Sequence, residues 1–226
     1  MKCDLCPRKC LVDRKKGEKG ICGQTENLKV ARAALHFWEE PCISGDAGSG
    51  AVFFSGCPLH CVFCQNENIA NGTVGKEISL ERLVDIFLEL QEKRANNINL
   101  VTPGHFVPQI VKALDQARKE GLTLPVVYNT SSYETVDTIK MLEGYVDIYL
   151  PDFKYMSPVL SKKYSRAPDY AEVAKAAIAE MVRQTGKAVF VNGDEDNLIL
   201  SGTIVRHLTL PGCMADSMQI VKYLHD

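Results

Sequence analysis

Residues 51–66, AVFFSGCPLHCVFCQN, run from a short apolar strand directly into three closely spaced cysteines. Cys57, Cys61 and Cys64 follow the spacing C-x3-C-x2-C, which puts three thiols on one loop. A closed zinc site and a ferredoxin-type iron–sulfur cluster each take four protein ligands. Either a distant cysteine completes this site, or one coordination position of the metal stays open for chemistry.

The composition is that of a folded protein. The chain has 226 residues, of which 46% are hydrophobic, and a formal net charge of −2. This suits one domain with a small appendage. The charge lacks the basic footprint of a nucleic-acid-binding protein, so we expect no nucleic-acid partner. No apolar run reaches membrane-spanning length and the start, MKCDLCPRKC, has no signal core, so we expect no membrane partner and a cytoplasmic location.

Seven of the nine cysteines fall into two clusters. The second cluster consists of Cys3, Cys6, Cys10 and Cys22. Without a secretion signal, such clustering favours metal ligation over disulfides. Because this segment is too short for a core of its own, four thiols predict a structural staple there, either zinc or an auxiliary iron–sulfur cluster. Cys42 and Cys213 stand outside both clusters, and we expect them to be packed thiols.

Strand and helix patterns alternate after residue 48. The expected strands are 51–56, 97–103, 124–130, 146–152 and 204–212, after a strand-like run at 28–41. The expected helices are 79–94, 108–121, 136–144, 169–186 and 216–225, and a hairpin-like insertion occupies 188–202. Repeated strand–helix units imply an α/β fold with a parallel sheet, either open or curved as a (β/α) barrel. We therefore divide the chain into a Cys-rich metal-binding segment, 1–48, and a (β/α) domain, 49–226.

Polar or irregular residues follow every expected strand. After the cysteine loop they are TPGHF (102–106), NTSSY (129–133), PDFKY (151–155) and LPGC (210–213). Each polar residue alone is more often a capping or solvated group. Because ligands collect at the carboxyl ends of parallel strands, the residues together predict an active site at this edge.

The cysteine motif after the first strand, with Phe63 before its third cysteine, resembles that of the radical S-adenosylmethionine (SAM) superfamily. Stretches 48–66, 97–106, 125–134, 146–155 and 206–212 are similar to proteins related to pyruvate formate-lyase activating enzyme. That branch also carries an N-terminal motif like CDLCPRKC…GICG, so the resemblance runs from Cys3 to about Ser217. It implies a [4Fe–4S] cluster with three cysteine ligands, whose fourth iron binds S-adenosylmethionine.

The resemblance also implies which residues form the site. Cys57, Cys61 and Cys64 would be the cluster ligands and catalytic residues. The cofactor contacts would be Phe63 near the adenine, then Thr102, Pro103, Gly104, His105, Asn129, Thr130, Asp152, Lys154 and Arg206. The TPGH segment stands where many relatives have a Gly-Gly-Glu stretch that binds the methionine amino group. Asp152 would pair with positive groups of the cofactor or a cation, and Arg206 with its carboxylate or with a structural partner.

This chain departs from the branch at three places. Gly104 and Ser132 stand where relatives more often have Thr and Gly. Relatives also continue into a sixth strand, whereas this chain ends at Asp226. We therefore expect a partial (β/α) barrel that lacks its last strand, with strand five as an exposed edge.

The resemblance implies an oxidoreductase, handled anaerobically, that cleaves S-adenosylmethionine to a 5′-deoxyadenosyl radical for hydrogen abstraction. Its substrate would be a glycyl-radical enzyme, another protein or a small molecule, and a flavodoxin or ferredoxin would donate the electron. A non-catalytic iron–sulfur or zinc protein for binding or electron transfer remains an alternative, supported by the missing strand. A zinc hydrolase ranks last, because His60, flanked by ligands, suits packing better than general-base chemistry.

Overall fold

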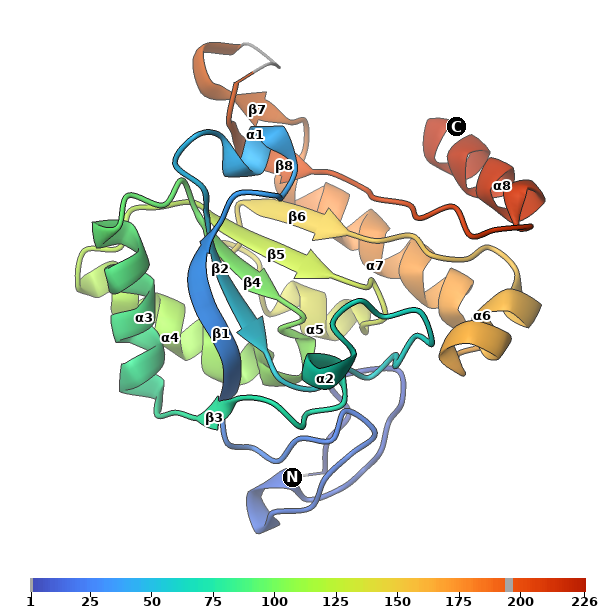
Figure 1. The fold of residues 1–226 in the computed structure, drawn as a ribbon, viewed down its shortest axis with the longest axis horizontal. Helices are drawn as coiled ribbons and strands as arrows, with labels where there is room; N and C mark the ends of the chain where they lie inside the picture. The colour runs from blue at the N-terminus through green and yellow to red at the C-terminus, as the bar shows by residue number, and fades with distance from the viewer. Residues whose placement is uncertain (1, 194–196) are drawn as a thin grey trace.

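The computed structural model describes residues 2–193 and 197–226. Its described residues form a mixed α/β fold around an eight-stranded sheet with the order β3-β1-β2-β4-β5-β6-β8-β7 (Figure 1). The strands are β1 (Lys29–His36), β2 (Ser49–Phe54), β3 (Lys76–Glu77), β4 (Ile98–Val101), β5 (Val126–Thr130), β6 (Ile148–Pro151), β7 (Val189–Phe190) and β8 (Ile199–Thr203). The helices are α1 (Pro41–Ser44), α2 (Glu67–Ala70), α3 (Leu80–Glu92), α4 (Val107–Lys119), α5 (Val136–Lys140), α6 (Pro158–Ser165), α7 (Tyr170–Thr185) and α8 (Met214–His225).

Strands β2, β4, β5, β6 and β8 are neighbours in parallel, as the repeated strand–helix units predict. Their carboxyl ends therefore share one edge of the sheet. Helices α3, α4, α5 and α7 cover one face, where Leu100, Tyr128 and Tyr149 join the largest hydrophobic core (Figure 1). Since side chains alternate along a strand, Asn99 and Asn129 point to the opposite face. That second face carries the polar residues of the candidate site.

The fifth parallel strand is not where the sequence predicts it. The expected strand is 204–212, but β8 overlaps the end of the expected hairpin and stops at Thr203. Beyond it, the parallel pairing continues only as a bridge between Asp152 and Arg206. The alternating apolar and polar residues after position 204 belong instead to an extended segment in which Leu208 is exposed. The expectation of an exposed edge is also wrong, because β7 pairs with β8 through Val189 and Ser201. Residues 194–196 of the expected hairpin lie outside the described residues.

The five expected helices are present as α3, α4, α5, α7 and α8; their ends differ from the prediction by at most two residues, except that α5 ends at Lys140 and not at Gly144. Ser79 caps α3 as predicted, with its side chain accepting a hydrogen bond from the Arg82 amide. Helix α6 was missed, although Ser157 caps it and Pro158 follows, a pattern typical of a helix start. Strand β1, from the expected N-terminal segment, pairs antiparallel with β2.

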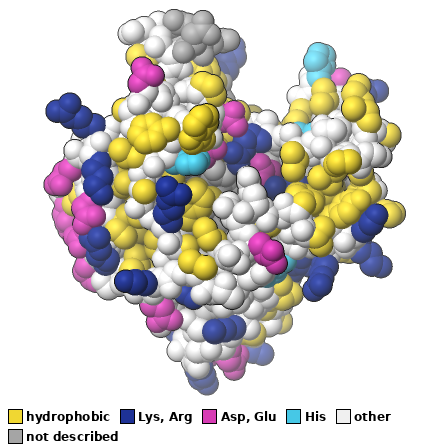
Figure 2. Space-filling model, in the orientation of Figure 1, with side chains coloured by type: hydrophobic (Ala, Val, Ile, Leu, Met, Phe, Trp, Pro, Cys, Tyr) yellow, Lys and Arg dark blue, Asp and Glu magenta, His cyan; other side chains and the backbone are white. Residues whose placement is uncertain are grey.

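Helix α8 is held to the body by one side of its surface. Ile220 is fully buried, and the Tyr223 ring packs against Phe153 with ring centres 5.7 Å apart. Its other apolar side chains, among them Met214, Met218 and Val221, are exposed. Figure 2 shows hydrophobic side chains gathered at the right, over α6 and α8. None of the helices in the described part of the chain is long and apolar enough to cross a membrane.

Candidate active site

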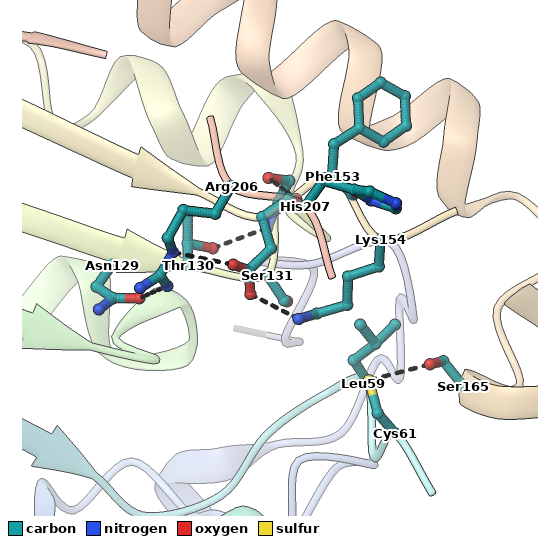
Figure 3. Close-up of polar contacts among 12 residues, drawn as sticks. Leu59, Cys61, Asn129, Thr130, Ser131, Phe153, Lys154, Ser165, Arg206 and His207 are labelled. Carbon is teal, nitrogen blue, oxygen red and sulfur yellow. Dashed lines mark hydrogen bonds and ion pairs between the residues drawn. The ribbon is translucent and has the colours of Figure 1, made fainter. Parts of the chain in front are cut away.

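The loop after β2 presents the three cysteine thiols at the carboxyl edge of the parallel strands. The Cys57 sulfur accepts a hydrogen bond from the Leu59 amide at 3.4 Å. The Cys61 sulfur accepts one from the Ser165 hydroxyl at 3.0 Å (Figure 3). Burial raises the pKa of Cys57 to about 11 and also raises the pKa of Cys64. The thiols of Cys57 and Cys64 therefore keep their protons near neutral pH until a metal displaces them.

A lysine ammonium faces this loop from the end of β6. Figure 3 shows the Lys154 side chain reaching toward Leu59 and Cys61. Its Nζ lies 2.6 Å from a carboxylate oxygen of Asp152. Burial alone lowers the pKa of Lys154, but the charges of Asp152 and Cys61 more than offset it, so this pKa is raised. The ammonium therefore stays charged beside the cysteines.

Behind this pair, a network of charged and amide groups crosses the second face of the sheet. Arg206 donates to Asp152 at 3.2 Å, to Glu39 at 2.8 Å and to the amide oxygen of Asn129 at 2.7 Å. The other oxygen of Glu39 accepts from the amide nitrogens of Asn99 and Asn129, both at 3.0 Å. Because two carboxylates flank the guanidinium, the geometry favours a structural ion pair for Arg206 over the expected contact with a cofactor carboxylate.

The TPGH segment has an unusual backbone. Thr102 has a φ of 55°, in the left-handed region that a β-branched residue rarely adopts, so this strand end is strained. At Gly104, a Cβ would lie 2.5 Å from a carboxylate oxygen of Glu134. The buried carboxylate therefore leaves no room for a side chain at position 104. The His105 ring is buried and bonds to the Ser55 carbonyl at 2.7 Å, so the structure does not bring it to the exposed surface of the site.

The loop after β5 is tied to the end of β6. Thr130 and Asn129 are nearly buried, and the Thr130 hydroxyl accepts a hydrogen bond from the Ser132 amide. Ser132 has a φ of 62°, a conformation that costs a residue other than glycine about 1–2 kcal/mol. Its hydroxyl donates to the Asp152 carbonyl at 2.7 Å, which offsets part of this cost. This contact holds the backbone of Asp152 beside the residues that follow β5.

Two buried groups under this segment predict opposite pH effects on the free energy of unfolding. Burial raises the pKa of Glu134 from 4.5 to about 7, against a hydrogen bond from the Tyr128 hydroxyl, so this group's contribution falls as the pH rises through that range. Burial lowers the pKa of His105 from 6.5 to about 4, beside Ser55 and the Arg14 guanidinium, so its contribution rises with pH. We expect the free energy of unfolding to rise more steeply with pH in Glu134→Gln than in the wild type, and less steeply in His105→Gln.

Urea unfolding midpoints measured at intervals between about pH 4.5 and 6.5 test this expectation. The wild-type protein is the reference, because its many other carboxyl groups are common to all three proteins. Equal slopes in the two variants would show that neither group keeps its shifted pKa.

The N-terminal segment packs against the same edge of the sheet. Arg8 donates to the Pro58 carbonyl at 2.9 Å, and His60 bonds to the Ile21 carbonyl at 2.8 Å, as expected of a packing residue. Burial raises the pKa of Cys6 to about 12 and also raises that of Cys22. Within the described residues, no group of three or more His, Cys, Asp or Glu side chains stands in the arrangement of a metal site. All nine cysteines are free thiols.

Comparison with known protein families identifies the family to which this fold and cysteine loop belong. The model of the radical SAM superfamily matches residues 51–194, which run from within β2 through the cysteine loop to beyond β7. The chain belongs to the radical SAM superfamily. Together with the five parallel strands, this match confirms the predicted partial (β/α) barrel with a Cys-rich N-terminus. Membership implies a [4Fe–4S] cluster and S-adenosylmethionine. The donor set fits this cluster, since three thiols lie on one loop and two of them, Cys57 and Cys61, accept hydrogen bonds that stabilise thiolates.

One curated relative aligns with nearly all of this radical SAM chain. It is an uncharacterized protein of Methanocaldococcus jannaschii, 28% identical over 215 residues. The alignment covers 92% of the chain and 57% of the relative, so the chain spans little more than half of the relative's length. The narrower resemblance to activating-enzyme-related proteins stays a prediction.

Proposed function

We propose that this chain is a radical SAM enzyme that reductively cleaves S-adenosylmethionine and uses the product to abstract hydrogen. Cys57, Cys61 and Cys64 would hold the cluster. When bound, the reduced cluster supplies the electron that splits the sulfonium into methionine and a 5′-deoxyadenosyl radical. The observation that carries this proposal is the placement of three free thiols and the Asp152–Lys154 pair at one edge of the sheet.

The residues around the loop suit the two halves of the cofactor. The Phe63 ring meets Tyr155 and Tyr164 edge-on, with ring centres 6.3 Å apart in each pair. This aromatic wall excludes water and offers an apolar surface for adenine. The methionine half carries one ammonium and one carboxylate, and Asp152 and Lys154 present the complementary charges side by side.

The decisive experiment is anaerobic reconstitution with iron and sulfide, followed by dithionite and S-adenosylmethionine. We expect 5′-deoxyadenosine and methionine in equal amounts. Their absence from protein with a full complement of four irons would favour the non-catalytic iron–sulfur alternative. Zinc-loaded protein serves as the control, because zinc has no redox chemistry.

Replacing Asp152 with asparagine is expected to weaken S-adenosylmethionine binding by at least about tenfold. The substitution keeps the shape of the side chain but removes the charge that pairs with Lys154 and Arg206. Losing a charge-assisted contact in a partly dry site costs about 1.5–3 kcal/mol. Anaerobic calorimetry on cluster-loaded protein measures the affinity.

Asp147→Asn is the matched control for this experiment. Asp147 precedes β6 at its other end and accepts a hydrogen bond from the Val126 amide, far from the cysteine loop. We expect near-normal affinity in this variant and near-normal iron content in both. Unchanged binding in Asp152→Asn would remove the β6 residues from the site.

The substrate and partners follow from the narrower resemblance alone. The substrate would be a glycyl-radical enzyme, another protein or a small molecule, and a flavodoxin or ferredoxin would supply the electron. At the N-terminus, Cys3, Cys6, Cys10 and Cys22 would hold zinc or an auxiliary iron–sulfur cluster. Anaerobic co-purification tests the first two proposals, and iron-to-protein and zinc-to-protein ratios test the third.

A further inference from the structure

A serine hydroxyl outside the predicted site touches one of the cysteine sulfurs. Ser165, the last residue of α6, donates from its Oγ to the Cys61 sulfur at 3.0 Å (Figure 3). The Ser165 Oγ also lies 2.7 Å from the hydroxyl of Tyr155. Since a serine hydroxyl has one proton and gives it to sulfur, Ser165 must accept from Tyr155. Tyr155 and Ser165 are fully buried, so the two hydroxyls are shielded from water, whereas Cys61 is half-buried.

The position of this hydroxyl is fixed by the backbone around it. The Val62 amide, inside the cysteine loop, donates to the Tyr164 carbonyl at 2.9 Å. Arg8 donates to the carbonyls of Ser165 and Pro58, both at 2.9 Å. The end of α6 is therefore tied to the cysteine loop directly and through Arg8. The guanidinium also compensates the negative end of the helix dipole, which would otherwise face the thiolates.

We propose that Ser165 is a positioning residue that raises the reduction potential of the cluster held by Cys57, Cys61 and Cys64. This inference rests on the proposed function, which places the cluster there. Reduction adds one electron from an external donor to the oxidised cluster, with no bond made or broken and no proton transferred. Because the added negative charge spreads onto the ligand sulfurs, an O–H donor to one sulfur stabilises the reduced form more than the oxidised form.

The test is an anaerobic redox titration of reconstituted full-length Ser165→Ala, followed by electron paramagnetic resonance of the reduced cluster. We expect the ratio of reduced to oxidised cluster at a fixed potential to fall about tenfold, which corresponds to a midpoint about 59 mV more negative. Tyr155→Phe keeps the ring and removes the hydroxyl that polarises Ser165, so it should shift the midpoint in the same direction by less.

Ser161→Ala is the matched control, because Ser161 is fully buried in the same helix and its hydroxyl donates to the Pro158 carbonyl instead of a cysteine. Its midpoint should equal the wild-type value. An unchanged midpoint in Ser165→Ala, or an equal shift in Ser161→Ala, would overturn the inference. If Ser165→Ala does not fold, an unchanged midpoint in Tyr155→Phe overturns it instead.

Failure of this inference is distinguishable from failure of the proposed function. Wild-type protein that cleaves S-adenosylmethionine, with no shift in the variants, contradicts the inference alone. Wild-type protein that does not cleave it, with the expected shift in Ser165→Ala, contradicts the proposed function alone. Wild-type protein that assembles no four-iron cluster overturns both.

Discussion

Replacing Cys61 with alanine is expected to abolish cleavage of S-adenosylmethionine and the signal of the reduced cluster. Two thiolates cannot hold three irons of a four-iron cluster, so the variant cannot offer a single open iron to the cofactor. The Ser165 hydroxyl loses its sulfur partner as well. Electron paramagnetic resonance with and without S-adenosylmethionine, together with chromatography of 5′-deoxyadenosine, measures both losses.

Cys213→Ala is the control for the cysteine variant. Cys213 is half-buried at the start of α8, and the only described hydrogen bond of its thiol is a long one, 3.7 Å, to the Pro211 carbonyl. We expect wild-type cluster content and cleavage in this variant. A Cys61→Ala protein that still binds four irons and cleaves the cofactor would show that the proposed assignment of the loop is wrong.

Much of the fold was predictable because the parallel strands and long helices carry local patterns. Strands buried on both faces are short apolar runs, and α3 and α4 repeat apolar side chains at helical spacing. Helix α6 was missed because eight residues offer little periodicity, so only the Ser157–Pro158 start identifies it. Strand β8 was misplaced because the alternation after residue 204 is equally strand-like, and only pairing with β6 decides between the two segments.

Within the candidate site, too, residues with a local sequence pattern were predictable and residues brought together by long-range contacts were not. The cysteine motif was recognisable because cluster ligation needs thiols at fixed local spacing. Glu39 was not, since its partner Arg206 lies 167 residues away and no periodic pattern encodes such a contact. Ser165 and Cys61 are likewise 104 residues apart. The search for polar residues after the parallel strands does not find them, because Glu39 lies in the loop after the antiparallel strand β1 and Ser165 at the end of α6.

Removing Glu39 is expected to have the largest effect on stability among the polar residues of the site. The Glu39 carboxylate, with only 10% of its side chain exposed, pairs with Arg206 and accepts from both Asn99 and Asn129. In Glu39→Ala, two buried amides lose an acceptor and a guanidinium loses one of its two carboxylates. We expect the free energy of unfolding to fall by about 3 kcal/mol, at the low end for a broken buried pair, because Arg206 keeps Asp152.

Urea unfolding near neutral pH measures this loss, and the neighbouring residue provides the control. The substitution Glu40→Ala removes the same charge at the next position. Because the Glu40 side chain forms no described hydrogen bond or ion pair, this variant should change stability by less than about 0.5 kcal/mol. Combining Glu39→Ala with Arg206→Met removes both charges, and we expect the double variant to lose less stability than the sum of the single losses. A loss below about 1 kcal/mol in Glu39→Ala would show that water screens the network as it screens surface ion pairs.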